Sequence, residues 1–178
     1  MYENYIYFVK NFLLFSAFIQ FAILGTLGEY IGIWIEHKNI YNPFNTRELI
    51  LKAIGWGILG IIIKYAFTGF WGFTEALIHK GLLPSIFSTS FLYALGTSIF
   101  TNTLFGPQMM LFHRFTDNII MKRKNYKGIK NSILTLFWFW IPAHTVTFIL
   151  PAHLQIGLAA LWSVVLGVIL GFFKRENE

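Results

Sequence analysis

The stretch that decides the fold is NSILTLFWFWIPAHTVTFILPAHLQIGLAALWSVVLGVILGF, from Asn131 to Phe172, which contains no Asp, Glu, Lys or Arg. One bilayer crossing needs about 20 mostly apolar residues, so this stretch is long enough for two crossings that reverse near Leu150-Pro151. A second charge-free stretch runs from Leu82 to Phe112. The chain of 178 residues is 56% hydrophobic and 12% charged, whereas soluble domains have about 45–50% apolar and about 25% charged residues. The sequence therefore predicts an all-α, multi-pass membrane helix bundle.

Five crossings are expected in one domain, residues 1–178, because no polar linker divides the hydrophobic segments. Asn45 or Thr46 is expected to cap the second segment, and Gly81 followed by Pro84 to end it. Four crossings would result if the region from Pro142 to Pro151 is re-entrant. The first three segments are expected at about Asn11–Ile35, Glu48–Ile78 and Pro84–Phe112, the third broken at Gly106-Pro107.

Positive charge predicts the orientation. Six of the 14 Lys and Arg residues lie between Arg114 and Lys130, and short basic loops stay in the cytoplasm. With five spans, the N-terminus is then outside and the C-terminus inside. No cleavable signal peptide is recognisable. A bias toward Phe, Ile, Asn and Lys is typical of an AT-rich genome, so we expect a bacterial cytoplasmic membrane.

Several function classes are excluded or unsupported. The chain has no cysteine, which excludes disulfides, thiolate catalysis and Cys-based zinc or iron–sulfur sites. The five histidines lack the close same-face spacing of a helical zinc motif, and neither a nucleophile elbow nor a Gly-rich phosphate loop is present. We expect no catalytic residue, metal or cofactor. Nucleic-acid binding is unsupported because the excess positive charge lies in one short loop.

Polar residues inside the hydrophobic segments are the candidate functional residues, because a charge near the bilayer centre costs about 2.5–3.5 kcal/mol on insertion scales. Glu29 and Lys64 either form a charge pair or line a path for solutes or protons. Lys64, Thr68 and Glu75 share one helix face, and segment three carries a second polar row. The alternative is ordinary hydrogen bonding between helices. The candidate path-lining or intramembrane polar residues are Glu29, Lys64, Thr68, Glu75, Thr101, Asn102, Gln108 and His144.

Small residues recur at helical spacing, which lets helix backbones approach closely in lipid. Such packing within the chain is the first interpretation, and a homo-oligomer through the Gly/Ala-rich faces is the second. The rows are Gly25, Gly28 and Gly32; Ala53, Gly57 and Gly60; and Ala159, Ser163, Gly167 and Gly171.

Two stretches resemble the Mpv family, also called the twenty-two-kilodalton peroxisomal membrane protein family. The first is FGPQMMLFHRFTD from Phe105 to Asp117, and the second is WIPAHTVTFILP from Trp140 to Pro151. The resemblance implies a small multispanning membrane protein, with members proposed to be channels or pores for small solutes, and it implies no catalytic residue. The family-like positions are Gly106, Pro107, Phe112, His113, Asp117, Trp140, Pro142, Phe148 and Pro151.

The sequence thus favours a channel or transporter-like protein for small polar solutes or ions. The alternative is a non-transporting structural or accessory membrane subunit. A third hypothesis is an intramembrane enzyme acting on lipid through His113, Arg114 and Asp117 near the head groups. A channel would place the polar groups along a path, a structural subunit would bury them dry, and an enzyme would gather them in one pocket.

Overall fold

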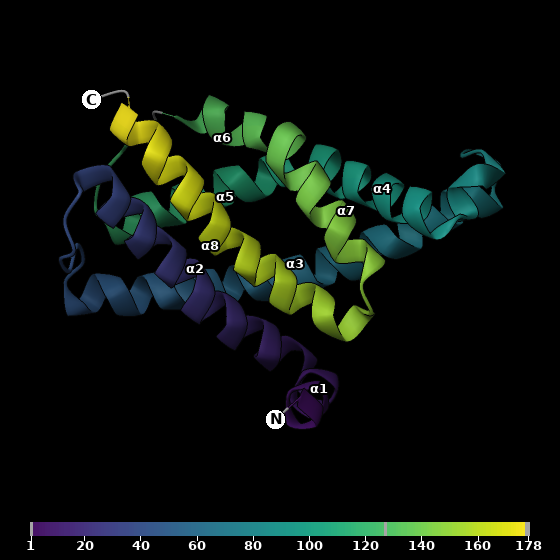
Figure 1. Ribbon diagram of the computed structural model, residues 1–178, viewed down its shortest axis with the longest axis horizontal. Coiled ribbons are helices and arrows are strands. Elements are labelled where there is room, and N and C mark those ends of the chain that lie inside the picture. Colours follow the sequence, from purple (N-terminus) through teal and green to yellow (C-terminus); the bar gives the residue numbers. More distant parts are fainter. Residues whose placement is uncertain (1, 127, 177–178) are drawn as a thin grey trace. The chain divides into compact units, whose positions relative to one another are not determined.

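The computed structural model describes residues 2–126 and 128–176, and within this part the chain is helical and contains no strand (Figure 1). The prediction of an all-α fold is confirmed. Two segments are π-helical and are labelled η2 and η3; η1 is a short 3-10 helix. The elements are α1 (Tyr2–Asn11), α2 (Leu13–His37), α3 (Thr46–His79), η1 (Ser85–Ser88), α4 (Ser90–Phe100), η2 (Thr101–Phe105), α5 (Gly106–Ile120), α6 (Ile129–Thr135), η3 (Leu136–Trp140), α7 (Ile141–Ile149) and α8 (Ala152–Glu176).

Four helices in the described part are long and apolar enough to cross a membrane: Leu13–His37, Thr46–His79, Ile129–Ile149 and Ala152–Phe172. The helix is interrupted at Leu150 and Pro151, between the last two, as expected, and the reversal of the chain there stays a prediction. The count is one lower than the five expected. The segment from Ser90 to Ile120 is helical but is not among the four, because serine, threonine and asparagine interrupt its apolar character. The orientation that assumes five spans stays a prediction.

Local sequence signals explain where the helices end. Lys38 adopts a left-handed conformation with φ of 51° after α2. Asn45 and Glu48 then form a capping box: the Glu48 amide donates to Asn45 Oδ1 over 2.9 Å, and the Asn45 amide donates to Glu48 Oε2 over 3.0 Å. Gly81, with φ of 70°, follows the end of α3. Both expected signals are confirmed.

The described residues form two compact units. Unit 1 consists of residues 2–61 and 156–176, and unit 2 consists of residues 62–126 and 128–155. Helix α3 contributes its first part to unit 1 and its second part to unit 2. The single domain expected for residues 1–178 stays a prediction.

Close backbone contact between α2 and α8 holds unit 1 together, and the two helices lie side by side in Figure 1. A Cβ atom added at Gly28 would lie 2.6 Å from the carbonyl oxygen of Ser163, and one added at Gly171 would lie 2.6 Å from that of Gly32. Gly60 of α3 faces the carbonyl oxygen of Ala17 at the same distance. The predicted role of the small residues in packing within the chain is therefore confirmed, because any larger side chain would separate these backbones.

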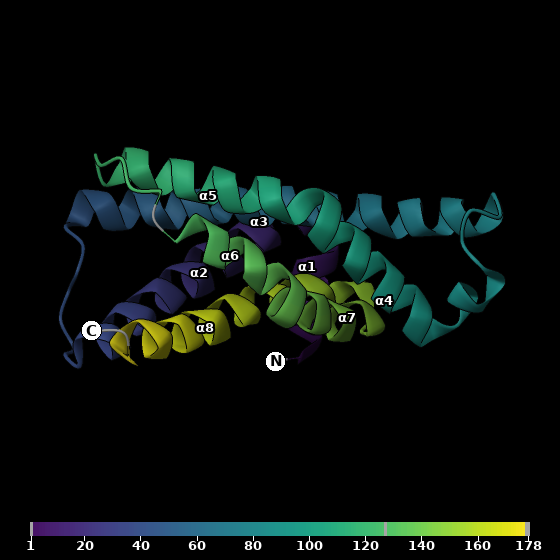
Figure 2. The same ribbon diagram turned by 90° about the horizontal axis from the view of Figure 1, so that it is seen from above.

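In unit 2, α4 packs along α7 (Figure 2). Helices α4 and α5 form one helical run through η2, so the break expected at Gly106-Pro107 is wrong. Pro107 has no N–H and its ring would crowd the preceding turn of a regular α-helix. The wider π-turn accommodates it: the Gly106 amide bonds to the carbonyl of Thr101, five residues back.

Candidate functional site

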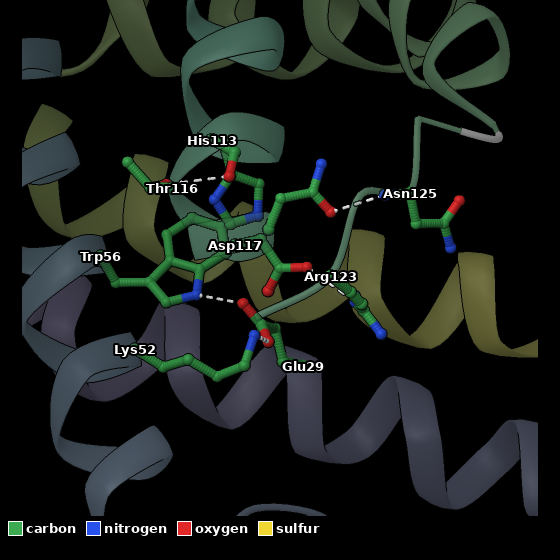
Figure 3. A network of polar contacts seen from close by, with 9 residues as sticks. Glu29, Lys52, Trp56, His113, Thr116, Asp117, Arg123 and Asn125 are labelled. Carbon is green, nitrogen blue, oxygen red and sulfur yellow. Dashed lines mark hydrogen bonds and ion pairs between the residues drawn. The ribbon is translucent and has the colours of Figure 1, made fainter. Parts of the chain in front are cut away.

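The carboxylate of Glu29 is the centre of a polar cluster in unit 1 (Figure 3). Lys52 Nζ of α3 lies 2.5 Å from Glu29 Oε2, and Trp56 Nε1 donates to Glu29 Oε1 over 2.7 Å. The side chain of Lys52 is 4% exposed and that of Glu29 is 20% exposed. Charge neutralisation and the indole hydrogen bond together offset the cost of removing both ions from water.

The loop between α2 and α3 closes over this ion pair. Lys52 Nζ lies 4.7 Å from the ring centroid of buried Phe44, in the geometry of a cation–π contact. Phe44 packs edge-on against Tyr30, with ring centroids 5.2 Å apart, and the Tyr30 hydroxyl donates to Asn42 Oδ1 over 2.7 Å. Unit 1 thus holds Glu29 with Lys52, whereas the sequence had suggested Lys64 as its possible partner.

A second polar cluster lies in unit 2, where α4 meets α7. The Ser98 hydroxyl donates to the carbonyl of Ile141 over 2.7 Å, and Asn102 Nδ2 donates to the carbonyl of Ser98 over 2.8 Å. His144 Nδ1 lies 3.2 Å from Asn102 Oδ1. We call Ser98, Asn102, Ile141 and His144 the Asn102–His144 cluster. All three polar side chains are buried.

The hydrogen bonds determine the tautomer of His144. Because the amide nitrogen of Asn102 already donates to Ser98, its oxygen is the acceptor and Nδ1 of His144 carries the hydrogen. The imidazole is enclosed by aromatic rings, with centroids 5.0 Å away at Trp140, 5.1 Å at Phe67 and 6.2 Å at Phe148. Trp140 Nε1 is buried and has no hydrogen-bond partner within the described part of the chain.

Both π-turns flank this cluster and follow the same pattern. Asn102 lies within η2, and η3 ends at Trp140, one residue before Ile141. In each case the amide after the π-turn bonds five residues back and a proline follows, Pro107 in one and Pro142 in the other. The two π-turns also contact each other. π-Turns are frequent at functional sites, which makes this cluster the stronger candidate.

Lys64 lies in unit 2, on α3, and its side chain is half-buried. Its ammonium group makes no ion pair or hydrogen bond to any residue between 2 and 126 or 128 and 176. Phe67, one turn further along α3, is the residue that packs against His144. Lys64 is therefore an unpaired cation on the helix that covers the Asn102–His144 cluster.

Of the other candidate path-lining residues, one is buried and three are exposed. Thr101 is buried and its hydroxyl donates to the carbonyl of Thr97 over 2.7 Å. Thr68, Glu75 and Gln108 are exposed. Glu75 Oε1 lies 3.9 Å from His79 Nε2, a pair that is charged only when the histidine is protonated. The path-lining role of these residues stays a prediction.

Some of the positions that resemble the Mpv family are buried and others are exposed. Gly106 packs against Leu136, since an added Cβ would lie 2.7 Å from Leu136 Cδ2. Trp140 and Phe148 are buried beside His144. Pro107 is half-buried, and Phe112, Pro142 and Pro151 are exposed.

The residues of the enzyme hypothesis lie near the end of α5. Arg123 Nη2 binds Asp117 Oδ2 over 2.7 Å (Figure 3), and His113 is half-buried with its carbonyl accepting from Thr116 over 2.9 Å. Asn118 Oδ1 accepts from the amide of Asn125 over 3.0 Å, which fixes the loop after the helix. These contacts stabilise the helix end. Within the described residues, no three His, Asp or Glu side chains are grouped to hold a metal ion.

Sequence reasoning missed Lys52, Trp56 and Ser98. Lys52 lies near the start of the second expected segment, where a lysine is ordinarily exposed. In the structure its long side chain carries the charge to Glu29. A carboxylate inside an apolar helix was the available signal, because it requires donors on a neighbouring helix.

Comparison with known proteins adds no relative: no family model, no curated protein and no solved structure matches this chain. The resemblance to the Mpv family stays a prediction. The described residues 2–126 and 128–176 are helical without strands, and their four apolar helices suit a multi-pass protein of a lipid bilayer.

Proposed function

We propose that this protein carries a small polar solute or an ion across the membrane. The observation that supports the proposal is Lys64, a cation within a membrane-crossing helix, whose ammonium group has no hydrogen-bond or ion-pair partner among the described residues. Ionisable groups inside transmembrane segments commonly mark substrate or proton paths.

The position of Lys64 along α3 makes its insertion into the bilayer costly in free energy. Between Ala53 and Thr74, a stretch of 22 residues, Lys64 is the one charged residue. At ~1.5 Å per residue this stretch is about 33 Å long, which matches the ~30 Å hydrocarbon core. Lys64 is the twelfth residue of that stretch and so belongs near mid-depth. A hydrophobic residue there would insert at about 3 kcal/mol lower cost, so a role in transport explains why a lysine is present.

The Asn102–His144 cluster provides the second support. His144 is an ionisable side chain inside another apolar helix, and the indole N–H of Trp140 beside it is buried without an acceptor. A passing water or polar solute would supply that acceptor. Non-regular helical turns at membrane depth are tolerated where protein or a wet cavity surrounds them, and two such turns meet here. The Mpv resemblance points to the same class of function.

Flux into proteoliposomes tests the proposal. Vesicles containing the protein should pass at least one small ion or neutral polar solute ten times faster than empty vesicles. Lys64→Met should change the rate or the selectivity at least fivefold. Lys80→Met is the matched control, because Lys80 is an exposed lysine outside α3, and it should leave flux unchanged. Equal permeability of empty and loaded vesicles across the whole panel would refute the proposal.

A membrane accessory subunit is the second candidate, and the same unpaired lysine favours it. A carboxylate on a partner chain would neutralise Lys64, while the Asn102–His144 hydrogen bond would serve only to hold α4 and α7 together. In that case Lys64→Met would release a co-purifying membrane protein and no solute flux would be measured.

A further inference from the structure

The excess positive charge of the chain is confined to the stretch that forms unit 2. Residues 62–155 contain eight of the 14 Lys and Arg residues and two of the eight Asp and Glu residues, so they carry the whole formal charge of +6. The rest of the chain contains six residues of each sign. Of the two carboxylates in unit 2, Asp117 is bound to Arg123 and Glu75 is exposed. A field of this sign attracts anions and repels cations.

Oxygen atoms of the Asn102–His144 cluster that could bind a cation already accept hydrogen bonds. The carbonyl of Ile141 accepts from the hydroxyls of Ser98 and Thr145, each over 2.7 Å. The carbonyl of Ser98 accepts from Asn102 Nδ2, and Asn102 Oδ1 accepts from His144 Nδ1. Because a metal cation binds to oxygen, it would have to compete with these donors.

The side-chain group that has no partner beside this cluster is a hydrogen-bond donor. Trp140 is 7% exposed, and its Nε1 is enclosed with no acceptor in the described part of the chain. The centroid of its ring lies 5.0 Å from that of His144. An indole N–H only donates, so an anion that reaches it gains a hydrogen bond and breaks none. Water accepts such a bond as well, and charge decides between the two.

Lys64 supplies that charge from α3. Its ammonium group is unpaired within residues 2–126 and 128–176, and Phe67, three residues further along, has its ring centroid 5.1 Å from that of His144. Lysine and arginine side chains along a pore select anions. One buried positive charge neutralises one negative charge, whereas a divalent anion would keep an uncompensated charge in the low dielectric of the bilayer. The charge of Lys64 therefore favours a monovalent anion.

We propose that the species carried across the membrane is a small monovalent anion, which binds in turn to the Lys64 ammonium and to the Trp140 indole N–H. This inference rests on the proposed function and names its substrate class. Retention of positive loops in the cytoplasm explains the basic residues between Arg114 and Lys130. It explains neither a lysine at mid-depth nor a buried indole without an acceptor.

Ion flux from proteoliposomes tests the substrate class. Vesicles are loaded with the potassium salt of chloride, nitrate or sulfate, and anion efflux is followed while valinomycin supplies potassium permeability. Chloride and nitrate should leave at least tenfold faster than from empty vesicles, and sulfate at least tenfold more slowly than chloride. Sodium and glycerol, measured in parallel, should cross no more than twofold faster than in empty vesicles.

Two substitutions with matched controls assign the flux to these groups. Lys64→Met should lower the chloride rate at least tenfold, and Lys80→Met should leave it unchanged. Trp140→Phe keeps an aromatic ring but removes the N–H, and it should lower the chloride rate at least fivefold. Its control is Trp138→Phe, which replaces an exposed tryptophan of η3. The thermal transition of each variant shows that it is folded, and wild-type chloride flux in folded Lys64→Met or Trp140→Phe would overturn the proposal.

Binding to the full chain in detergent separates this inference from transport itself. Calorimetric titration with sodium chloride, in a sodium sulfate buffer, should show chloride binding that Lys64→Met and Trp140→Phe each weaken at least tenfold. Such binding without flux of any solute would refute transport and support the anion site. Flux of sodium or glycerol without flux of chloride would overturn the anion inference and leave the proposed function standing. Absence of both chloride binding and chloride flux would also overturn it.

Discussion

His144 Nδ1 and Asn102 Oδ1 lie 3.2 Å apart in unit 2, where both side chains are buried. This contact joins a residue of η2 to a residue just beyond η3. Each side chain thereby supplies the hydrogen-bond partner of a polar atom of the other. Burying the intact pair costs little folding free energy, whereas removing one member leaves a buried polar atom without a partner and destabilises the protein.

The double substitution in this pair should therefore destabilise the protein by less than the sum of the two single substitutions. Asn102→Leu strands the His144 N–H, and His144→Phe strands the Asn102 oxygen. Each should lower the free energy of unfolding by about 1–3 kcal/mol, and the double variant should lose less than the sum. Denaturant unfolding in mixed micelles measures this, with Gln108→Leu as an exposed control expected within about 0.5 kcal/mol of wild type. Additive losses would show that the two side chains do not interact.

The ion pair of Glu29 with Lys52 should show the same coupling. Removing one member of a buried pair costs about 3–5 kcal/mol, whereas removing both is often nearly neutral. The 20% exposure of Glu29 places the expected loss for Lys52→Met at the lower end. Melting temperatures of Lys52→Met, Glu29→Gln and the double variant test the coupling. A double variant as unstable as the sum of the singles would contradict the pairing.

Glycine-to-alanine changes should have opposite signs at two kinds of position. At Gly28 a Cβ would meet the carbonyl oxygen of Ser163 at 2.6 Å, so Gly28→Ala must move α2 from α8. Overpacking of this kind costs about 1–3 kcal/mol. At Gly69 a Cβ meets nothing within 4 Å, so Gly69→Ala should stabilise α3 by about 0.5–1 kcal/mol. Equal thermal shifts in the two variants would argue against the close α2–α8 contact.

The basic loop between α5 and α6 should face the cytoplasm, because positively charged short loops are retained there. The chain has no cysteine, so a single introduced thiol reports one position. Tyr126 and Leu82 are 51% and 68% exposed. With five crossings, an impermeant reagent outside intact cells should spare Tyr126→Cys and label Leu82→Cys, whereas equal labelling of the two would show that the segment between them does not cross. The reverse pattern would invert the orientation.

The sequence by itself determined that the chain is helical and belongs in a bilayer. A charge-free stretch such as Asn131–Phe172 can be compared directly with the number of residues needed to cross the hydrocarbon core. Inside that core the backbone N–H and C=O groups must be paired, and a helix pairs them within the segment. Local signals were equally clear in the sequence: the helix cap at Asn45, the turn at Gly81 and the helix break at Pro151 depend on neighbouring residues alone. The rows of small residues predicted close helix packing, because the lack of a large side chain is what allows two backbones to approach.

Only the tertiary structure decided which polar groups meet. Lys52, not Lys64, binds Glu29, because the partner depends on how far one helix is rotated and shifted along another, which helical spacing does not encode. Thr68 and Glu75 share a face with Lys64 yet are exposed, since the side of α3 that other helices cover is set by packing. The π-turns before Pro107 and Pro142 likewise replace an expected break. Near these π-turns the Ser98 hydroxyl donates across to the carbonyl of Ile141, and the Asn102 side chain donates back to the carbonyl of Ser98. The contact between Ser98 and Ile141 exists only once α4 and α7 lie together.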